Sequence, residues 1–166
     1  MSAISKTFAR FTCGTALLLA AVLFAGSCSS MDKPASASFA SVVIVNQTPE
    51  QIRQAVFTVF QDNGYQTIPQ SDATLVFQRE ATRREQIDYA GFAGAQAGEK
   101  VAIRVRVNVW PKNPGAYWVG CKAYAVCNPG QGVFENTTAL FDFQSKPYQK
   151  LMDQVAQRVV MSTPAP

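Results

Sequence analysis

The stretch VAIRVRVNVWPKNPGAYWVGCKAYAV, residues 101–126, decides the fold of this chain. Residues 101–110 alternate valine and isoleucine with polar side chains, which is the period of a strand with one buried and one wet face. The sequence PKNPG at 111–115 is a strong turn signal, and residues 116–126 alternate again. The sequence therefore predicts a long antiparallel hairpin.

Upstream of the hairpin, the sequence predicts a strand, an amphipathic helix and a short two-stranded hairpin. The helix signal is the clearest of these, because Thr48 can cap it, Gln51 completes a capping box and Gly64 can end it in a left-handed conformation. The expected ranges are 42–45 for the strand, 48–64 for the helix with its caps, and 65–69 and 74–79 for the short strands.

Downstream, residues 138–143 are predicted to add one more strand, and Ser145 is expected to cap a final helix that starts near Pro147. The fold class we predict is α+β, with a two-layer, mostly antiparallel sheet carrying two helices on one face. Periodicity does not fix the order of the strands. This element order is loosely similar to that of helix-grip modules, including those in a lipoprotein of the outer-membrane β-barrel assembly complex.

Residues 1–27 have the pattern of an export signal. Lys6 and Arg10 form a positive start, and the uncharged residues 11–26 are fewer than the roughly 20 that a membrane span needs. The small residues Ala25-Gly26-Ser27 before Cys28 resemble the lipobox of bacterial lipoproteins. The resemblance implies removal of residues 1–27 and a diacylglyceryl group on the sulfur of Cys28.

In a bacterium with two membranes, the same resemblance implies anchoring at the periplasmic face of the outer membrane, because Ser29 rather than aspartate follows the cysteine. The alternative is cleavage by ordinary signal peptidase within residues 35–38, which would release a soluble periplasmic protein. The partners expected from the anchored form are the membrane, through the N-terminal lipid, and other envelope proteins.

The mature chain would be one domain with loose ends. We expect a flexible linker at 28–41, a single domain at 42–161 and a disordered tail at 162–166. Without Lys6 and Arg10, the 15 basic residues fall to 13 against 11 acidic ones, a formal charge of +2. This balance gives no argument for a nucleic-acid partner.

Catalytic patterns are sparse. The chain contains no histidine, which removes the Ser-His-Asp and Cys-His arrangements and histidine-ligated zinc. Its carboxylates are scattered singly, and no glycine motif for binding phosphates is present. We therefore expect no enzymatic activity, no cofactor and no metal site.

Cys121 and Cys127 raise the question of a disulfide. An oxidising compartment favours a bridge between them, and we expect one. Strand geometry opposes it, because six extended residues span about 20 Å whereas a disulfide needs α-carbons within about 7 Å. The alternative is two thiols that remain free.

Two surfaces are candidates for binding. The first is the polar side of the predicted hairpin, whose aromatic and basic side chains could contact a partner or simply pack across the strands: Arg104, Arg106, Trp118, Lys122 and Tyr124. The second is a surface loop expected around residues 88–98, where Arg83 and Arg84 precede Tyr89 and could meet an anionic partner or lipid headgroups. The plain reading of that loop is a solvated segment.

These patterns favour a membrane-anchored envelope lipoprotein with a small, non-catalytic periplasmic domain that binds other proteins. The alternative is a periplasmic carrier of lipid or small ligands, of helix-grip type, which requires an apolar cavity lined by aromatic side chains.

Overall fold

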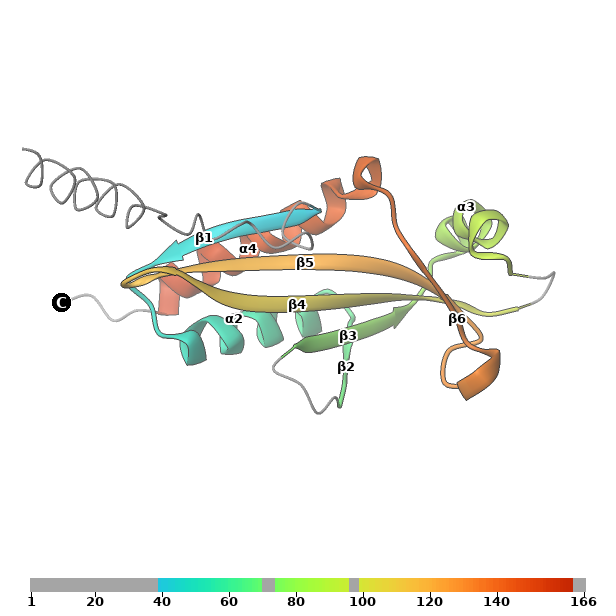
Figure 1. Ribbon diagram of the computed structural model, residues 1–166, viewed down its shortest axis with the longest axis horizontal. Coiled ribbons are helices and arrows are strands. Elements are labelled where there is room, and N and C mark those ends of the chain that lie inside the picture. Colours follow the sequence, from blue (N-terminus) through green and yellow to red (C-terminus); the bar gives the residue numbers. More distant parts are fainter. Residues whose placement is uncertain (1–38, 70–73, 96–98, 163–166) are drawn as a thin grey trace, which may run out of the picture. The chain divides into compact units, whose positions relative to one another are not determined.

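The computed structural model describes residues 39–69, 74–95 and 99–162, which form an α+β fold built on one antiparallel sheet (Figure 1). The strands lie in the order β1-β5-β4-β3-β2, and β6 pairs with β5 beyond the end of β1. Their bounds are β1 Ala40–Val45, β2 Gln66–Ile68, β3 Leu75–Glu80, β4 Val101–Asn113, β5 Ala116–Cys127 and β6 Asn136–Ala139. The predicted export signal, Cys28 and most of the predicted linker lie outside the described residues.

The predicted hairpin is confirmed as β4 and β5, the two longest strands. They pair from Val101 opposite Cys127 to Asn113 opposite Ala116, with an irregularity in the register near the turn. Gly115 takes a φ of 76° there, a conformation that L side chains rarely adopt, and its carbonyl accepts a 2.8 Å hydrogen bond from the Asn46 N–H. This bond ties the tip of the hairpin to the end of β1.

Two of the helices match the predicted ones and lie on the same face of the sheet (Figure 1): α2, Pro49–Asp62, and α4, Lys146–Ser162. The capping box of α2 forms as predicted, because Thr48 Oγ1 accepts from the Gln51 N–H at 3.2 Å and Gln51 Oε1 accepts from the Thr48 N–H at 2.9 Å. The helix ends at Asp62, and Gly64 just beyond its C-cap takes a φ of 79°.

A third helix, α3 at Arg83–Ala93, replaces most of the surface loop predicted around residues 88–98. It starts with a second capping box, between Thr82 and Glu85, and ends at Gly94, which adopts the left-handed conformation. The prediction failed because the segment lacks an apolar stripe, and Ile87 on it is largely exposed. The other boundary differences are small: β1 starts at Ala40, and β6 is shorter than predicted and gives way to a 3₁₀ turn at Asp142–Gln144.

The core lies between the sheet and the helices. Phe60 of α2 stacks on Phe77 of β3 with ring centroids 4.5 Å apart, and each such buried side chain contributes about 1.5–3 kcal/mol. Seven completely buried side chains of the hairpin alternate along it as predicted: Ile103, Val105, Val107, Val119, Cys121, Ala123 and Ala125. Ala102 and Val126, which pair with each other on the opposite face, are buried as well. Even α3 joins this cluster, through Ala93.

The free edge of β1 is covered by a side chain rather than by another strand. The Oε1 atom of Gln149 in α4 accepts from the Ser41 N–H, and its Nε2 atom donates to the Ser41 carbonyl, both at 3.1 Å. One amide thus satisfies the donor and the acceptor that an added strand would use.

The predicted disulfide is wrong for this fold. Cys121 and Cys127 are both buried free thiols. They lie six residues apart along β5, and a continuous strand holds their α-carbons at about 20 Å, far beyond bridging distance.

Candidate functional site

The face of the β4–β5 hairpin that points away from the helices is the candidate site, and we call it the outer face. Its members pair directly across the two strands: Arg104 with Tyr124, Arg106 with Lys122, Asn108 with Gly120, and Trp110 with Trp118. All five side chains predicted for this surface lie on it. The three helices of the described residues all pack into the core on the opposite face of the sheet.

Two positive charges meet at the centre of the outer face. Arg106 and Lys122 are directly opposite each other, an arrangement that costs stability because like charges repel across strands. The Cζ atom of Arg106 lies 5.2 Å from the ring centroid of Tyr124, and Lys122 Nζ lies 4.9 Å from that of Phe39. Each cation–π contact offsets about 0.5–1 kcal/mol of that cost. Lys122 also reaches Asp142 at 3.7 Å, whereas Arg106 is exposed.

An aromatic and apolar patch adjoins these charges. Trp110 and Trp118 face each other across the strands, and Lys112 Nζ lies 5.4 Å from the Trp118 ring centroid. On the neighbouring strand, Val43 stands opposite Trp118 and is 39% exposed. Tryptophan and arginine are the residue types that dominate binding energy at protein interfaces.

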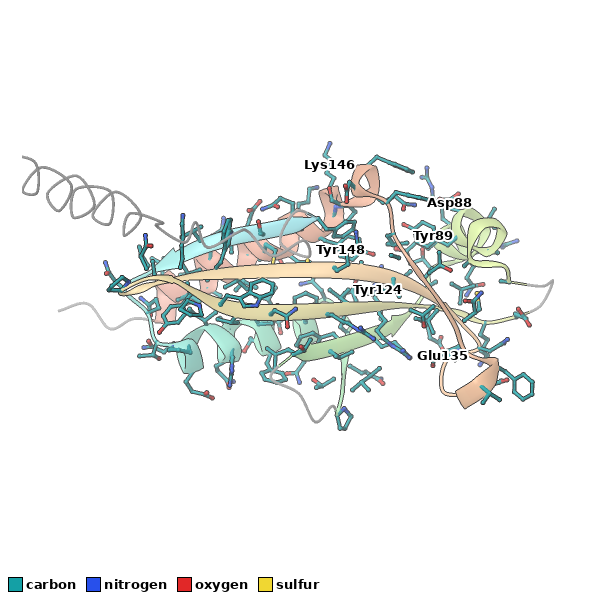
Figure 2. All side chains as sticks on the ribbon, viewed as in Figure 1. Asp88, Tyr89, Tyr124, Glu135, Lys146 and Tyr148 are labelled. Carbon is teal, nitrogen blue, oxygen red and sulfur yellow. The ribbon has the colours of Figure 1, made fainter. Side chains whose placement is uncertain are left out.

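Arg104 has a different role from Arg106, although both lie on β4 and point to the same face of the sheet. Its guanidinium bonds to both carboxylate oxygens of Glu135, at 2.5 and 3.0 Å, and to Gln78 Oε1, at 2.8 and 3.0 Å (Figure 2 labels Glu135). The hydrogen bond from Arg104, aided by the Gly130 N–H, holds the pKa of the Glu135 carboxyl below its usual range. Arg104 thus fastens the loop before β6 to the sheet, and its charge is neutralised there.

The second predicted pair, Arg83 and Arg84, does not join this surface. Both are exposed in the first turn of α3, and Arg84 pairs weakly with Asp88 at 3.8 Å. Tyr89 on the same helix is half-buried and packs against the core, and burial raises the pKa of its hydroxyl (Figure 2). The two predicted binding surfaces are therefore separate: Arg83 and Arg84 lie on α3, and the other five residues lie on the outer face of the hairpin.

Arg79, which sequence reasoning placed only at the entry of a loop, anchors α3 to the sheet. Its guanidinium contacts the two carboxylate oxygens of Glu85 at 2.6 and 2.8 Å and lies 5.2 Å from the ring centroid of Tyr65. Burial alone would raise the pKa of Glu85, but the hydrogen bonds from Arg79 and from Thr82 bring it below its ordinary value. The Arg79–Glu85 ion pair has a structural role, because each side chain neutralises the charge of the other.

A groove of about 1040 Å³ follows the sheet edge where β2 stops short of the end of β3. Four charged side chains contribute to its lining, together with polar and apolar ones: Arg79, Glu80, Lys100 and Arg104. It is open to solvent, unlike the enclosed aromatic cavity expected of a lipid carrier.

Burial keeps two side chains of the core in their neutral form. Burial raises the pKa of Cys121 to about 12 and also raises that of Tyr148, so both stay protonated. Within the described ranges, no group of three or more His, Cys, Asp or Glu side chains is placed to hold a metal ion. Nor is any described helix long and apolar enough to cross a membrane.

Comparison with known proteins gives no family. No family model matches the chain, and no curated protein matches it. Two solved structures of the adenylate sensor of AMP-activated protein kinase are distantly similar at 16% identity. The complex with ZMP has a TM-score of 0.40 and covers 74% of this chain and 95% of that one. The complex with ATP has a TM-score of 0.39 and covers 71% and 93%. Likenesses at this level carry no functional argument.

Sequence reasoning missed several members of the outer face for different reasons. Trp110 continues the even-numbered alternation of Arg104 and Arg106, so the period alone could have included it. Lys112 lies in the predicted turn, where the pairing of the two strands is irregular. Val43 required the pairing of β1 with β5, which periodicity does not contain. No local signal marks Glu135, because it reaches Arg104 from 31 residues away.

Proposed function

We propose that this chain is a lipid-anchored envelope protein whose α+β domain binds another protein through the outer face and performs no catalysis. One observation carries the binding half of the proposal: Arg106 and Lys122 stand directly opposite each other on the face of the sheet away from the three described α-helices. A protein pays stability for such an arrangement, and an acidic partner would relieve it.

The flanking side chains fit the same role. Trp118, with Trp110 opposite it, offers broad, rigid surface beside the charges, and Lys112 extends the positive character along the strand. An interface built on these groups would bury aromatic anchors at its centre and use the cations for orientation. The partner we expect is an acidic surface of an envelope protein.

The anchoring half of the proposal rests on the sequence before Cys28, which lies outside the described residues. The carrier alternative gains no support from the site, because the groove at the sheet edge is open and partly charged.

Site-specific crosslinking in living cells tests the binding proposal. A photoreactive benzoylphenylalanine replaces Val43, which borders the Trp118 side of the outer face, and a control probe replaces the exposed Gln157 of α4. We expect one discrete crosslinked product from position 43 and none of the same mass from position 157. Charge reversal with R106E and K122E together should lower its yield at least about tenfold, because two central cations are lost.

R83E and R84E together are the matched control, since they reverse the same number of charges on α3 and should leave the crosslink intact. Circular dichroism and thermal unfolding establish that both double variants are folded. Equal loss in both variants, or a crosslink indifferent to R106E and K122E, would contradict binding through the outer face.

A further inference from the structure

We propose that one corner of the domain dips into the bilayer to which the chain is anchored, and this inference rests on the lipid anchor proposed above. The corner consists of Phe141 and Phe143 with the two lysines that follow them, Lys146 and Lys150. We call it the docking corner. It adjoins the outer face at Lys122, which pairs with Asp142, but its exposed phenylalanines belong to a different segment of the chain.

Two phenylalanines are displayed to solvent at this corner. Phe141 is 54% exposed and Phe143 is 82% exposed, and their rings stack with centroids 5.6 Å apart and planes 10° apart. Large exposed apolar side chains grouped in this way mark contact sites for a membrane or a protein.

The 3₁₀ turn that carries the phenylalanines is held in place by hydrogen bonds. The Phe141 N–H donates to Gln144 Oε1 and the Gln144 N–H donates to the Phe141 carbonyl, both at 2.9 Å. Asp142, which separates the two phenylalanines in the sequence, forms an ion pair with Lys122 of β5 at 3.7 Å. The pair is thus presented on a fixed support.

The start of the described chain lies at the same corner. Phe39 packs against Tyr148 in the first turn of α4, with ring centroids 5.3 Å apart, and its ring lies 4.9 Å from Lys122 Nζ. Lys122 therefore contacts both Phe39 and Asp142. Cys28 precedes Phe39 by eleven positions, which limits the reach between them to about 40 Å. A lipid on Cys28 would keep this corner within about 40 Å of the bilayer.

The charges beside the phenylalanines suit a lipid surface. Lys146 and Lys150 are both exposed and four residues apart, so they share a side of α4, and Figure 2 shows Lys146 at the first turn of that helix. Lysines with long apolar stems beside aromatic rings are typical of segments that rest on headgroups and attract anionic lipids.

The test uses the full chain, purified from membranes and reconstituted into vesicles of phosphatidylcholine and phosphatidylglycerol, with or without bromine on the acyl chains. F143W places a fluorophore at the docking corner. F134W is the matched control, because Phe134 is also exposed, at 73%, in the 3₁₀ turn before β6, whereas Phe143 lies in the turn after it. The parent chain supplies the background of its two tryptophans, Trp110 and Trp118.

If the docking corner enters the bilayer, brominated lipid should quench about half or more of the emission added by F143W, because interfacial side chains reach about 5–10 Å below the headgroups. Emission added by F134W should stay unchanged. A chain that carries lipid and floats with the vesicles, yet shows no quenching at position 143 or equal quenching at both positions, overturns the docking corner and leaves the anchor standing. A chain without lipid that fails to float overturns both.

Discussion

Two arginines on β4 show how far a single residue's role depends on its neighbours. Arg104 and Arg106 occupy equivalent positions in the alternation, and the sequence assigns them the same surface. In the structure Arg104 is neutralised by Glu135 and Gln78, whereas Arg106 stacks beside Tyr124 and stays exposed. The alternation predicts the face on which each arginine lies. The position of Glu135, in the loop before β6, determines that Arg104 is neutralised and Arg106 is not.

The thiols provide a prediction at the same scale. Cys121 is completely buried with its pKa raised to about 12, and the Cys127 thiol donates to the Ala93 carbonyl at 3.4 Å. We therefore expect both to resist iodoacetamide in the folded protein at pH 8, and both to react in denaturant without any reductant. The physical reason is that alkylation needs an accessible thiolate.

Peptide mapping measures the two sites separately, because trypsin cuts after Lys122, between them. Cys28 in unlipidated precursor is the internal standard for a reactive thiol. If labelling in denaturant appeared only after reduction, the bridge would exist and the continuous β5 strand would be wrong.

At the scale of elements, α2 and α4 carry a stripe of apolar side chains, whereas α3 does not. Ile52, Val56 and Val59 of α2 repeat at helical spacing and pack on the sheet, so both the helix and its buried face could be predicted. α3 has only its capping box and glycine stop as local signals, and its attachment depends on Arg79 of β3. The sequence therefore predicted α2 and α4, whose apolar faces pack in the core. It did not predict α3, which is attached to the sheet by the Arg79–Glu85 ion pair.

This attachment makes the stability of α3 dependent on pH. The folded-state pKa of Glu85 is lowered, so its contribution is present above the ordinary carboxyl range and is lost as the pH falls through the lowered value. E85Q should remove the ion pair and weaken the capping box, which loosens α3 by about 1–3 kcal/mol while the core strands keep their stability. Hydrogen exchange of the α3 amides measures the effect, in the parent protein and E85Q at pH 7 and in the parent protein down to about pH 2.

Gln51 is the matched control, because it occupies the same capping position in α2 without an arginine partner. Q51E should leave α3 exchange unchanged at pH 7. An α3 helix whose protection is the same in E85Q and the parent protein at pH 7, and does not fall in the parent between pH 7 and about pH 2, would show that the Arg79–Glu85 pair does not hold it.

For the whole molecule, the α+β class and the central hairpin follow from the period of residues 101–126, because one wet and one buried face require a layer on one side only. The strand order does not follow. β1 and β6 both pair with β5, each along a different part of its length, and this arrangement depends on long-range contacts that have no period. The outer face could be predicted as a face, but its rim of Val43 and Glu135 could not.

The proposed anchor gives a prediction at this scale. C28S should move the full chain from the membrane fraction to the soluble periplasm, because acyl chains supply about 0.8 kcal/mol per buried methylene. Fractionation and the intact mass of the mature protein measure it, and the parent mass should begin at Cys28 with added acyl chains.

C13S is its control, since Cys13 lies in the predicted leader and should not affect the mature protein. A C28S chain that stays in the membrane after a carbonate wash, or a parent protein whose mass begins within residues 35–38, would argue for an unlipidated export product.

The amide of Gln149 has a consequence for how copies of this protein meet. Proteins confined to a plane collide sideways far more often than proteins in free solution, and an open strand edge would turn such collisions into ribbons of paired sheets. Because Gln149 already occupies the donor and acceptor of Ser41, the β1 edge offers an approaching copy no backbone partner at that residue. The Gln149 side chain thereby disfavours edge-to-edge pairing of β1 with a second copy at Ser41.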